Sequence, residues 1–79
     1  MKDRIIDCLK NGITVSFNPL NIEGVRKIEL RLTYFGNDGL KVQNNKSLYP
    51  AEFQEEQIAS DTIFKLHSAI RQHIYLDQE

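Results

Sequence analysis

The sequence predicts an α+β protein of two layers, in which a three-stranded antiparallel β-meander carries an N-terminal helix and a C-terminal helical segment on one face (α-β-β-β-α). Two patterns carry this prediction. Apolar and polar residues alternate over residues 26–35, as they do in a strand with one buried face. Apolar residues then recur at helical spacing from Ile63 to Ile74, as they do along the buried stripe of a helix.

The length and composition favour a single soluble domain over residues 1–79. With 79 residues, the chain buries only about 60–65% of its unfolded surface, so its core is thin. A hydrophobic content of 41% and a charged content of 27% are typical of a globule rather than a disordered chain. No apolar run is long enough to cross a bilayer and no signal-peptide pattern opens the chain, so we expect a cytoplasmic protein without membrane contact.

Cys8 is the single cysteine of the chain. It therefore has no partner for an intrachain disulfide, and a cysteine-based metal site is excluded. We interpret Cys8 as a small buried side chain rather than a reactive thiol.

The N-terminal third predicts a helix, a strand and a loop. Residues 2–10 have helical spacing, and Asn11-Gly12 supplies the stop; the apolar side of this helix holds Ile5, Ile6, Cys8 and Leu9. Ile13, Val15 and Phe17 then alternate with polar residues, which predicts a first strand. Residues 18–25 contain proline, asparagine and glycine, and we interpret them as a loop that either covers an edge of the core or binds a ligand.

The middle of the chain predicts a hairpin. A long second strand spans residues 26–35, and Gly36-Asn37-Asp38-Gly39 is a good connector because these residue types accept positive φ. A short third strand follows over residues 40–43, and residues 44–47 read as a polar break. Since neither connection has room for a crossover helix, all three strands are expected to be antiparallel.

From Pro50 onward the chain is expected to be helical, because Pro50 suits a first helical position and acidic residues follow it. Ser60-Asp61 looks like a second helix start. Either one helix runs to residue 76, or a short helix over 50–57 meets a main helix over 61–75 at a bend. We favour the bend, because Phe53 and Ile58 do not lie on the same side of a continuous helix as the apolar stripe from Ile63 to Ile74.

The apolar stripe, which consists of Ile63, Leu66, Ile70 and Ile74, is expected to pack on the sheet. The strand residues that it is expected to contact are Val15, Phe17, Ile28, Leu30, Leu32, Leu40 and Val42.

The sequence contains no constellation that indicates catalysis, a metal or another cofactor, so we predict a protein that is not an enzyme. His67 and His73 differ by about 240° around a helix and cannot share a metal ion; we interpret both as boundary residues. Glu55 and Glu56 are sequential and diverge by about 100°, so they do not form an acid–base pair.

Charge is unevenly distributed along the chain. Residues 1–48 carry a net charge of +3 and residues 49–79 a net charge of −4, which gives −1 in total. This asymmetry indicates either two surfaces for two partners or a basic sheet against an acidic helical segment, and we favour the second. The acidic candidates for protein binding are Glu52, Glu55, Glu56 and Asp61.

The face of the sheet opposite the helices is the other candidate surface. It is expected to present Thr14, Ser16, Lys27, Glu29, Arg31, Thr33, Phe35, Lys41 and Gln43. The predicted basic site on this face, the alternative to the acidic residues, consists of Lys27, Arg31, Thr33, Phe35 and Lys41. Only Phe35 offers a stacking platform for bases, so nucleic acid is the weaker expectation for this face. An exposed strand edge is a third candidate surface, for a partner or for a second copy in a homodimer.

Three stretches resemble very small phage-encoded proteins, namely IIDCLKNGITVSF, IELRLTYFGNDGLKVQ and SDTIFKLHSAIRQHI. In element order and turn chemistry they are similar to the small anti-CRISPR proteins of Listeria phages. That family presents an acidic, DNA-mimicking surface to an RNA-guided nuclease, and the acidic stretch around Glu55 is the analogue here. The resemblance implies an accessory protein of a phage or mobile element without enzymatic activity.

Together these observations predict a non-enzymatic binding module. We expect it to bind and inhibit a host or phage protein, such as a host defence or regulatory protein. The alternative is a small homo-oligomer that binds nucleic acid or a phosphorylated ligand through the basic sheet face.

Overall fold

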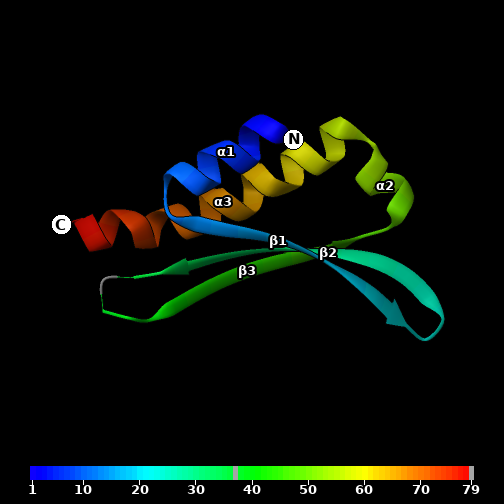
Figure 1. The fold of residues 1–79 in the computed structure, drawn as a ribbon, viewed down its shortest axis with the longest axis horizontal. Coiled ribbons are helices and arrows are strands. Elements are labelled where there is room, and N and C mark those ends of the chain that lie inside the picture. The colour runs from blue at the N-terminus through cyan, green and yellow to red at the C-terminus, as the bar shows by residue number, and fades with distance from the viewer. Residues whose placement is uncertain (37, 79) are drawn as a thin grey trace.

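A computed structural model describes residues 1–36 and 38–78 of the chain (Figure 1). Its elements, in order, are α1 (Lys2–Lys10), β1 (Ile13–Ile22), β2 (Val25–Phe35), β3 (Lys41–Leu48), α2 (Pro50–Gln54) and α3 (Glu56–Gln78). The three strands form one antiparallel sheet in the order β1-β2-β3. The helices lie together on one face of this sheet and leave the other face open (Figure 1). The predicted α+β meander is confirmed.

β1 and β2 form a long hairpin, so the predicted loop over residues 18–25 is wrong. β1 continues to Ile22, and only Glu23 and Gly24 connect it to β2. Their φ angles of 52° and 81° are both positive, as a type I′ turn requires, and this turn matches the twist of the two strands. Pro19 does not interrupt β1 because β1 is an edge strand, where a residue without an N–H group is tolerated.

The second connection follows the expected turn chemistry. The Gly36 N–H group donates to the Leu40 carbonyl at 2.9 Å, and the Leu40 N–H group donates to Asp38 Oδ1 at 2.9 Å. Gly39 has a φ of 82°, a conformation that glycine adopts without strain. Asn37, the remaining residue of the predicted turn, lies outside the described residues.

β3 is longer than predicted, and the polar break over residues 44–47 is wrong. Asn44 stands opposite Leu32 and Lys46 stands opposite Leu30, so these residues are part of the ladder. Asparagine and lysine have low strand propensity. Pairing with the long strand β2 overcomes this low propensity, because context decides strand formation more than propensity does.

The C-terminal segment is two helices, as favoured, but the break lies earlier than the Ser60-Asp61 signal. Glu55 has φ −82° and ψ 108°, which is extended backbone, and α3 begins at the next residue. Pro50 opens α2 as predicted. The Glu52 side chain caps this first turn by accepting a hydrogen bond from the Tyr49 N–H group at 3.0 Å.

The core lies between α3, α1 and the inner face of the sheet. The predicted stripe on α3 is buried, together with Cys8, Ile13, Leu30, Leu32 and Leu48. Leu40 was expected in this core but is 67% exposed, because it lies in the connector beyond the β2–β3 ladder. Leu9 was also expected to pack inward and is 59% exposed, because α1 turns Cys8 rather than Leu9 toward the core.

Candidate binding surfaces

The open face of the sheet holds the polar residues that the alternation in the sequence assigned to it. Leu30 and Leu32 are buried under the helices, so their neighbours on β2 point to the opposite face. The strand register brings three cross-strand rows together on that face: Thr14, Thr33 and Gln43; Ser16, Arg31 and Asn45; Asn18, Glu29 and Ser47. Lys27, Phe35 and Lys41 share the face nearer its two ends.

Glu29 is the centre of a hydrogen-bonded network on this face. Its side chain is only 12% exposed. One carboxylate oxygen lies 2.7 Å from Arg31 Nη2, and the same oxygen accepts from Asn18 Nδ2 at 3.5 Å. The other accepts from Asn45 Nδ2 at 3.3 Å. Three side chains from three strands thus converge on one carboxylate, and the centre of the open face is fixed rather than loosely solvated.

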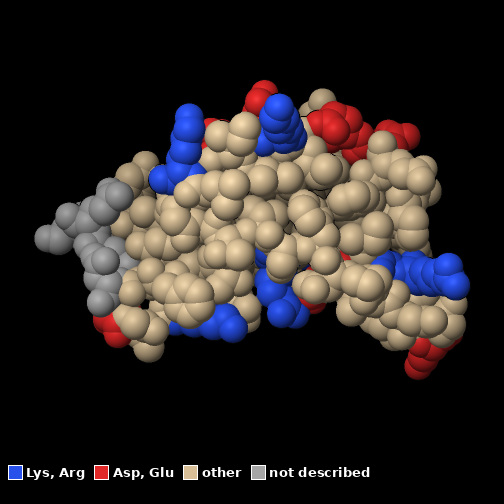
Figure 2. All heavy atoms as spheres, in the orientation of Figure 1, with Lys and Arg blue, Asp and Glu red and all other residues tan. Residues whose placement is uncertain are grey.

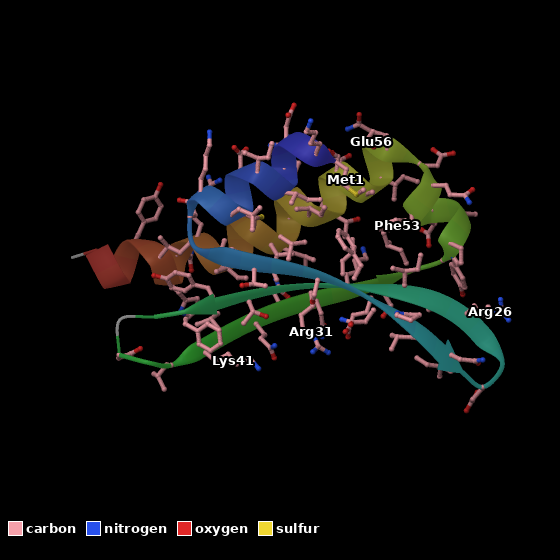
Figure 3. All side chains as sticks on the ribbon, viewed as in Figure 1. Met1, Arg26, Arg31, Lys41, Phe53 and Glu56 are labelled. Atoms are coloured by element: carbon pink, nitrogen blue, oxygen red, sulfur yellow. The ribbon has the colours of Figure 1, made fainter. Side chains whose placement is uncertain are left out.

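Arg31 was predicted as part of a basic binding site, but this network shows that it is not a free cation. Its guanidinium is paired with Glu29. Figure 3 shows the Arg31 side chain on the face of the sheet opposite the helices. Its Nε atom is buried and has no hydrogen-bond partner among the described residues. The charge of Arg31 is therefore largely neutralised within the protein, which the alternation pattern alone did not reveal.

The two lysines of the predicted basic site lie apart from each other. Lys27 Nζ lies 4.6 Å from the centre of the Tyr49 ring, a cation–π contact beside α2. Lys41 stands opposite Phe35 at the β2–β3 turn, and both are exposed. Figure 3 shows Lys41 near this end of the sheet. The five predicted basic-site residues share one face but do not form one compact cationic patch.

The acidic candidates are near each other at the α2–α3 junction, where acidic side chains gather in the space-filling view (Figure 2). Most of them have partners within the protein. Glu52 caps α2, Glu56 forms an ion pair with the amino group of Met1, and Asp61 accepts from Gln57 Nε2 at 3.0 Å. Glu55 is exposed at the break between the helices.

The overhanging end of the β1–β2 hairpin forms a shallow hollow of about 340 Å³ that sequence reasoning missed. It is bounded by residues 19–21, residues 26–28 and Pro50. Arg26 reaches out from this end of the hairpin (Figure 3). The alternation of apolar Leu20 and Ile22 with polar Asn21 was the available signal for a strand here, but Pro19 obscured it.

The two remaining titratable side chains considered from the sequence, His67 and Cys8, are buried. His67 was interpreted as a boundary residue but is buried, and this burial, followed by the nearby Arg71, lowers its pKa. Cys8 is fully buried as expected; burial, with a smaller effect of Asp7, raises its pKa to about 11. Within residues 1–36 and 38–75, no three His, Cys, Asp or Glu side chains are placed to hold a metal ion.

Comparison of the chain with protein-family models, with curated proteins and with solved structures found no match. Of the helices in the part of the chain that the structure describes, none is long and apolar enough to span a membrane.

Proposed function

We propose that this protein is a non-enzymatic binding module, an accessory protein of a phage or mobile element that binds and inhibits a host defence or regulatory protein. The observation that carries the proposal is the ordered network around Glu29 on an uncovered sheet face. Amide and hydroxyl groups held in fixed positions provide directional hydrogen bonds to a protein partner at low entropic cost.

The charges on this face favour a protein partner over nucleic acid. Affinity for a phosphate backbone comes from unpaired Lys and Arg side chains. Here Glu29 neutralises Arg31, and Lys27 lies over the Tyr49 ring. Phe35 and Tyr49 are at opposite ends of the face, so they do not form the neighbouring stacking platforms that single-stranded nucleic acid uses.

The open face is also preferred to the acidic surface as the interface. Glu52 and Glu56 each have a role in holding the fold, as a helix cap and as the partner of Met1. Glu55 is the acidic residue at the helix junction that is free to vary without loss of a cap. The acidic surface that the anti-CRISPR resemblance suggests is therefore the alternative interface.

The experiment is an affinity pull-down from the native host with three versions of the tagged protein. The unchanged chain is expected to retain one stoichiometric protein. Thr33→Glu combined with Gln43→Glu places two charges on the open face, in the row next to Arg31, and is expected to abolish retention. Glu55→Lys is the matched charge change on the acidic surface and is expected to leave retention intact.

Other outcomes would contradict the proposal in distinct ways. Loss of the partner with Glu55→Lys alone would move the interface to the acidic helices. Retention of nucleic acid only, weakened steeply by salt and by Lys27→Glu, would favour the nucleic-acid alternative. A melting temperature raised by a phosphorylated nucleotide, with no protein retained, would favour a phosphorylated ligand.

A further inference from the structure

The outer edge of β1 has free backbone hydrogen-bonding groups at alternate residues. Ile22 and Val25 flank a two-residue turn, and residues in this position exchange both of their backbone hydrogen bonds. Since bonded pairs alternate along an antiparallel ladder, every second residue back from Ile22 bonds to β2. The residues between them turn their backbone groups away from the sheet, namely Ile13, Val15, Phe17, Pro19 and Asn21. Pro19, which has no N–H group, occupies such an outward position.

No charged side chain of β1 opposes pairing along this edge, and Pro19, which has no N–H group, limits such pairing to the part of the strand before it. Residues 11–22 contain no Asp, Glu, Lys or Arg. The opposite edge, β3, carries Lys41 and also Lys46, which shares the inner face of the sheet with its partner Leu30. An inward-pointing lysine is a common device against edge-to-edge association. The two edges of this sheet therefore differ, and β1 is the one open to another strand.

Apolar side chains are exposed beside this edge. Phe17 lies on the inner face of β1 but is 41% exposed. On α1, which packs over β1, the Arg4 guanidinium lies 4.5 Å from the centre of the Phe64 ring of α3. Leu9 is about 140° and Ile6 about 200° around the helix from Arg4, so both face away from α3. Both are exposed, which leaves an apolar margin along the β1 side of the molecule.

We propose that β1 is the interface of a homodimer, in which β1 of one copy pairs antiparallel with β1 of a second copy about a two-fold axis at Val15. The two sheets then form one six-stranded sheet. Val15 pairs with its own counterpart, and Ile13 pairs with Phe17 of the second copy, all through outward-pointing backbone groups. Inner-face residues meet inner-face residues, so the helices of both copies lie on the same side.

The edge favours a second copy over a charged foreign strand, because an uncharged strand offers no electrostatic complement and meets itself without repulsion. The pairing brings the backbone of the second copy's β1 beside the exposed Phe17 side chain, opposite Ile13, which is itself buried in its own copy. It also closes the assembly, because the two edges left outside are the lysine-bearing β3 strands. The open face of each copy remains free for a partner.

The first test is the solution mass of the purified chain by sedimentation equilibrium. At about 100 μM, where a dimer with a Kd of about 10 μM is mostly formed, we expect twice the single-chain mass of 9.2 kDa. Val15→Pro removes an outward N–H group and is expected to return the mass to that of one chain. Gln43→Pro is the matched control, because Gln43 is an outward position on β3, and it is expected to keep the dimer.

The second test needs no substitution. In amide hydrogen exchange of the unchanged chain, Val15 and Phe17 are expected to be protected at high concentration and unprotected on dilution. Thr14 and Ser16 bond to β2 and are expected to be protected throughout. A single-chain mass at 100 μM, or concentration-independent exchange at Val15, would overturn the proposal. A dimer lost with Gln43→Pro and kept with Val15→Pro would place the interface on β3 instead.

Discussion

Arg31 Nη2 lies 2.7 Å from Glu29 Oε1, so the central cation of the open face is paired with a carboxylate two residues before it on the same strand. Residues two apart on a strand share a face, which makes this pairing a direct consequence of the alternation in the sequence. The pair converts a nominally basic surface into one that is locally neutral and ordered.

Replacing Glu29 with alanine is expected to lower the free energy of unfolding by about 1–2 kcal/mol, because hydrogen bonds to Arg31, Asn18 and Asn45 are lost together. The ion pair alone would contribute less than about 1 kcal/mol, since Arg31 is partly exposed. Urea denaturation measures the difference. Glu55→Ala, at an exposed position, is the control, and an equal effect of the two substitutions would show that the network does not stabilise the sheet.

Truncation of Leu32 is expected to unfold the protein or nearly so. Leu32 is fully buried, and Leu→Ala in a core costs about 2–5 kcal/mol, a large part of the stability of so small a domain. Leu40→Ala is the matched control and is expected to change the unfolding free energy by less than about 0.5 kcal/mol, because Leu40 is exposed. Circular dichroism during thermal unfolding distinguishes the two. A folded, unperturbed Leu32→Ala would be incompatible with the described core.

His67 is expected to make stability depend on pH. Burial lowers its folded-state pKa below the unfolded value of about 6.5, so the unfolded chain binds the additional proton first. Stability attributable to His67 is therefore complete above pH 6.5 and falls as the pH drops below it, by at most about 1.4 kcal/mol per pH unit. Denaturation at pH 7.5 and 5.5 measures this fall.

Two substitutions isolate that pH effect. His67→Gln is expected to reduce the difference in stability between the two pH values. His73→Gln, at an exposed position of the same helix, is expected to leave the difference as in the unchanged chain. If both variants retain the full pH dependence, the buried environment of His67 is not its source.

The Cys8 thiol is expected to be unreactive in the folded protein. It is fully buried and its pKa is raised to about 11, so little thiolate is present at pH 8. Labelling with a thiol reagent is expected to be at least about 100-fold slower in buffer than in denaturant, because it requires opening of the core. Rapid labelling of the native protein, at a rate near that in urea, would contradict the burial of this side chain.

The turn at Glu23 and Gly24 offers a stabilising substitution. Glu23 has a φ of 52°, a region that asparagine adopts more readily than glutamate. Glu23→Asn is expected to raise the free energy of unfolding by about 0.5–1 kcal/mol, and Gly24→Ala to lower it by about 1 kcal/mol because of its positive φ. Urea midpoints measure both changes. Opposite signs would show that residues 23 and 24 do not form this turn.

The sequence by itself determined the order of the elements and the inner and outer faces of the main strand. Period-two alternation over residues 26–35 and the stripe from Ile63 to Ile74 are strong because each is long, and burial acts on every repeat of the pattern. Cys8 was correctly assigned to the core for a similar reason, since small apolar side chains at helical spacing are seldom left in water.

Tertiary structure decided what local patterns leave ambiguous. Residues 18–22 and 44–47 became strands because β2 is long enough to pair with both, and strand formation depends on such neighbours more than on propensity. α3 starts at Glu56 rather than at Ser60-Asp61, directly after the extended backbone of Glu55. The neutralisation of Arg31 required Asn18, Glu29 and Asn45 to meet from three strands, and register is a property of the folded sheet that no single segment encodes.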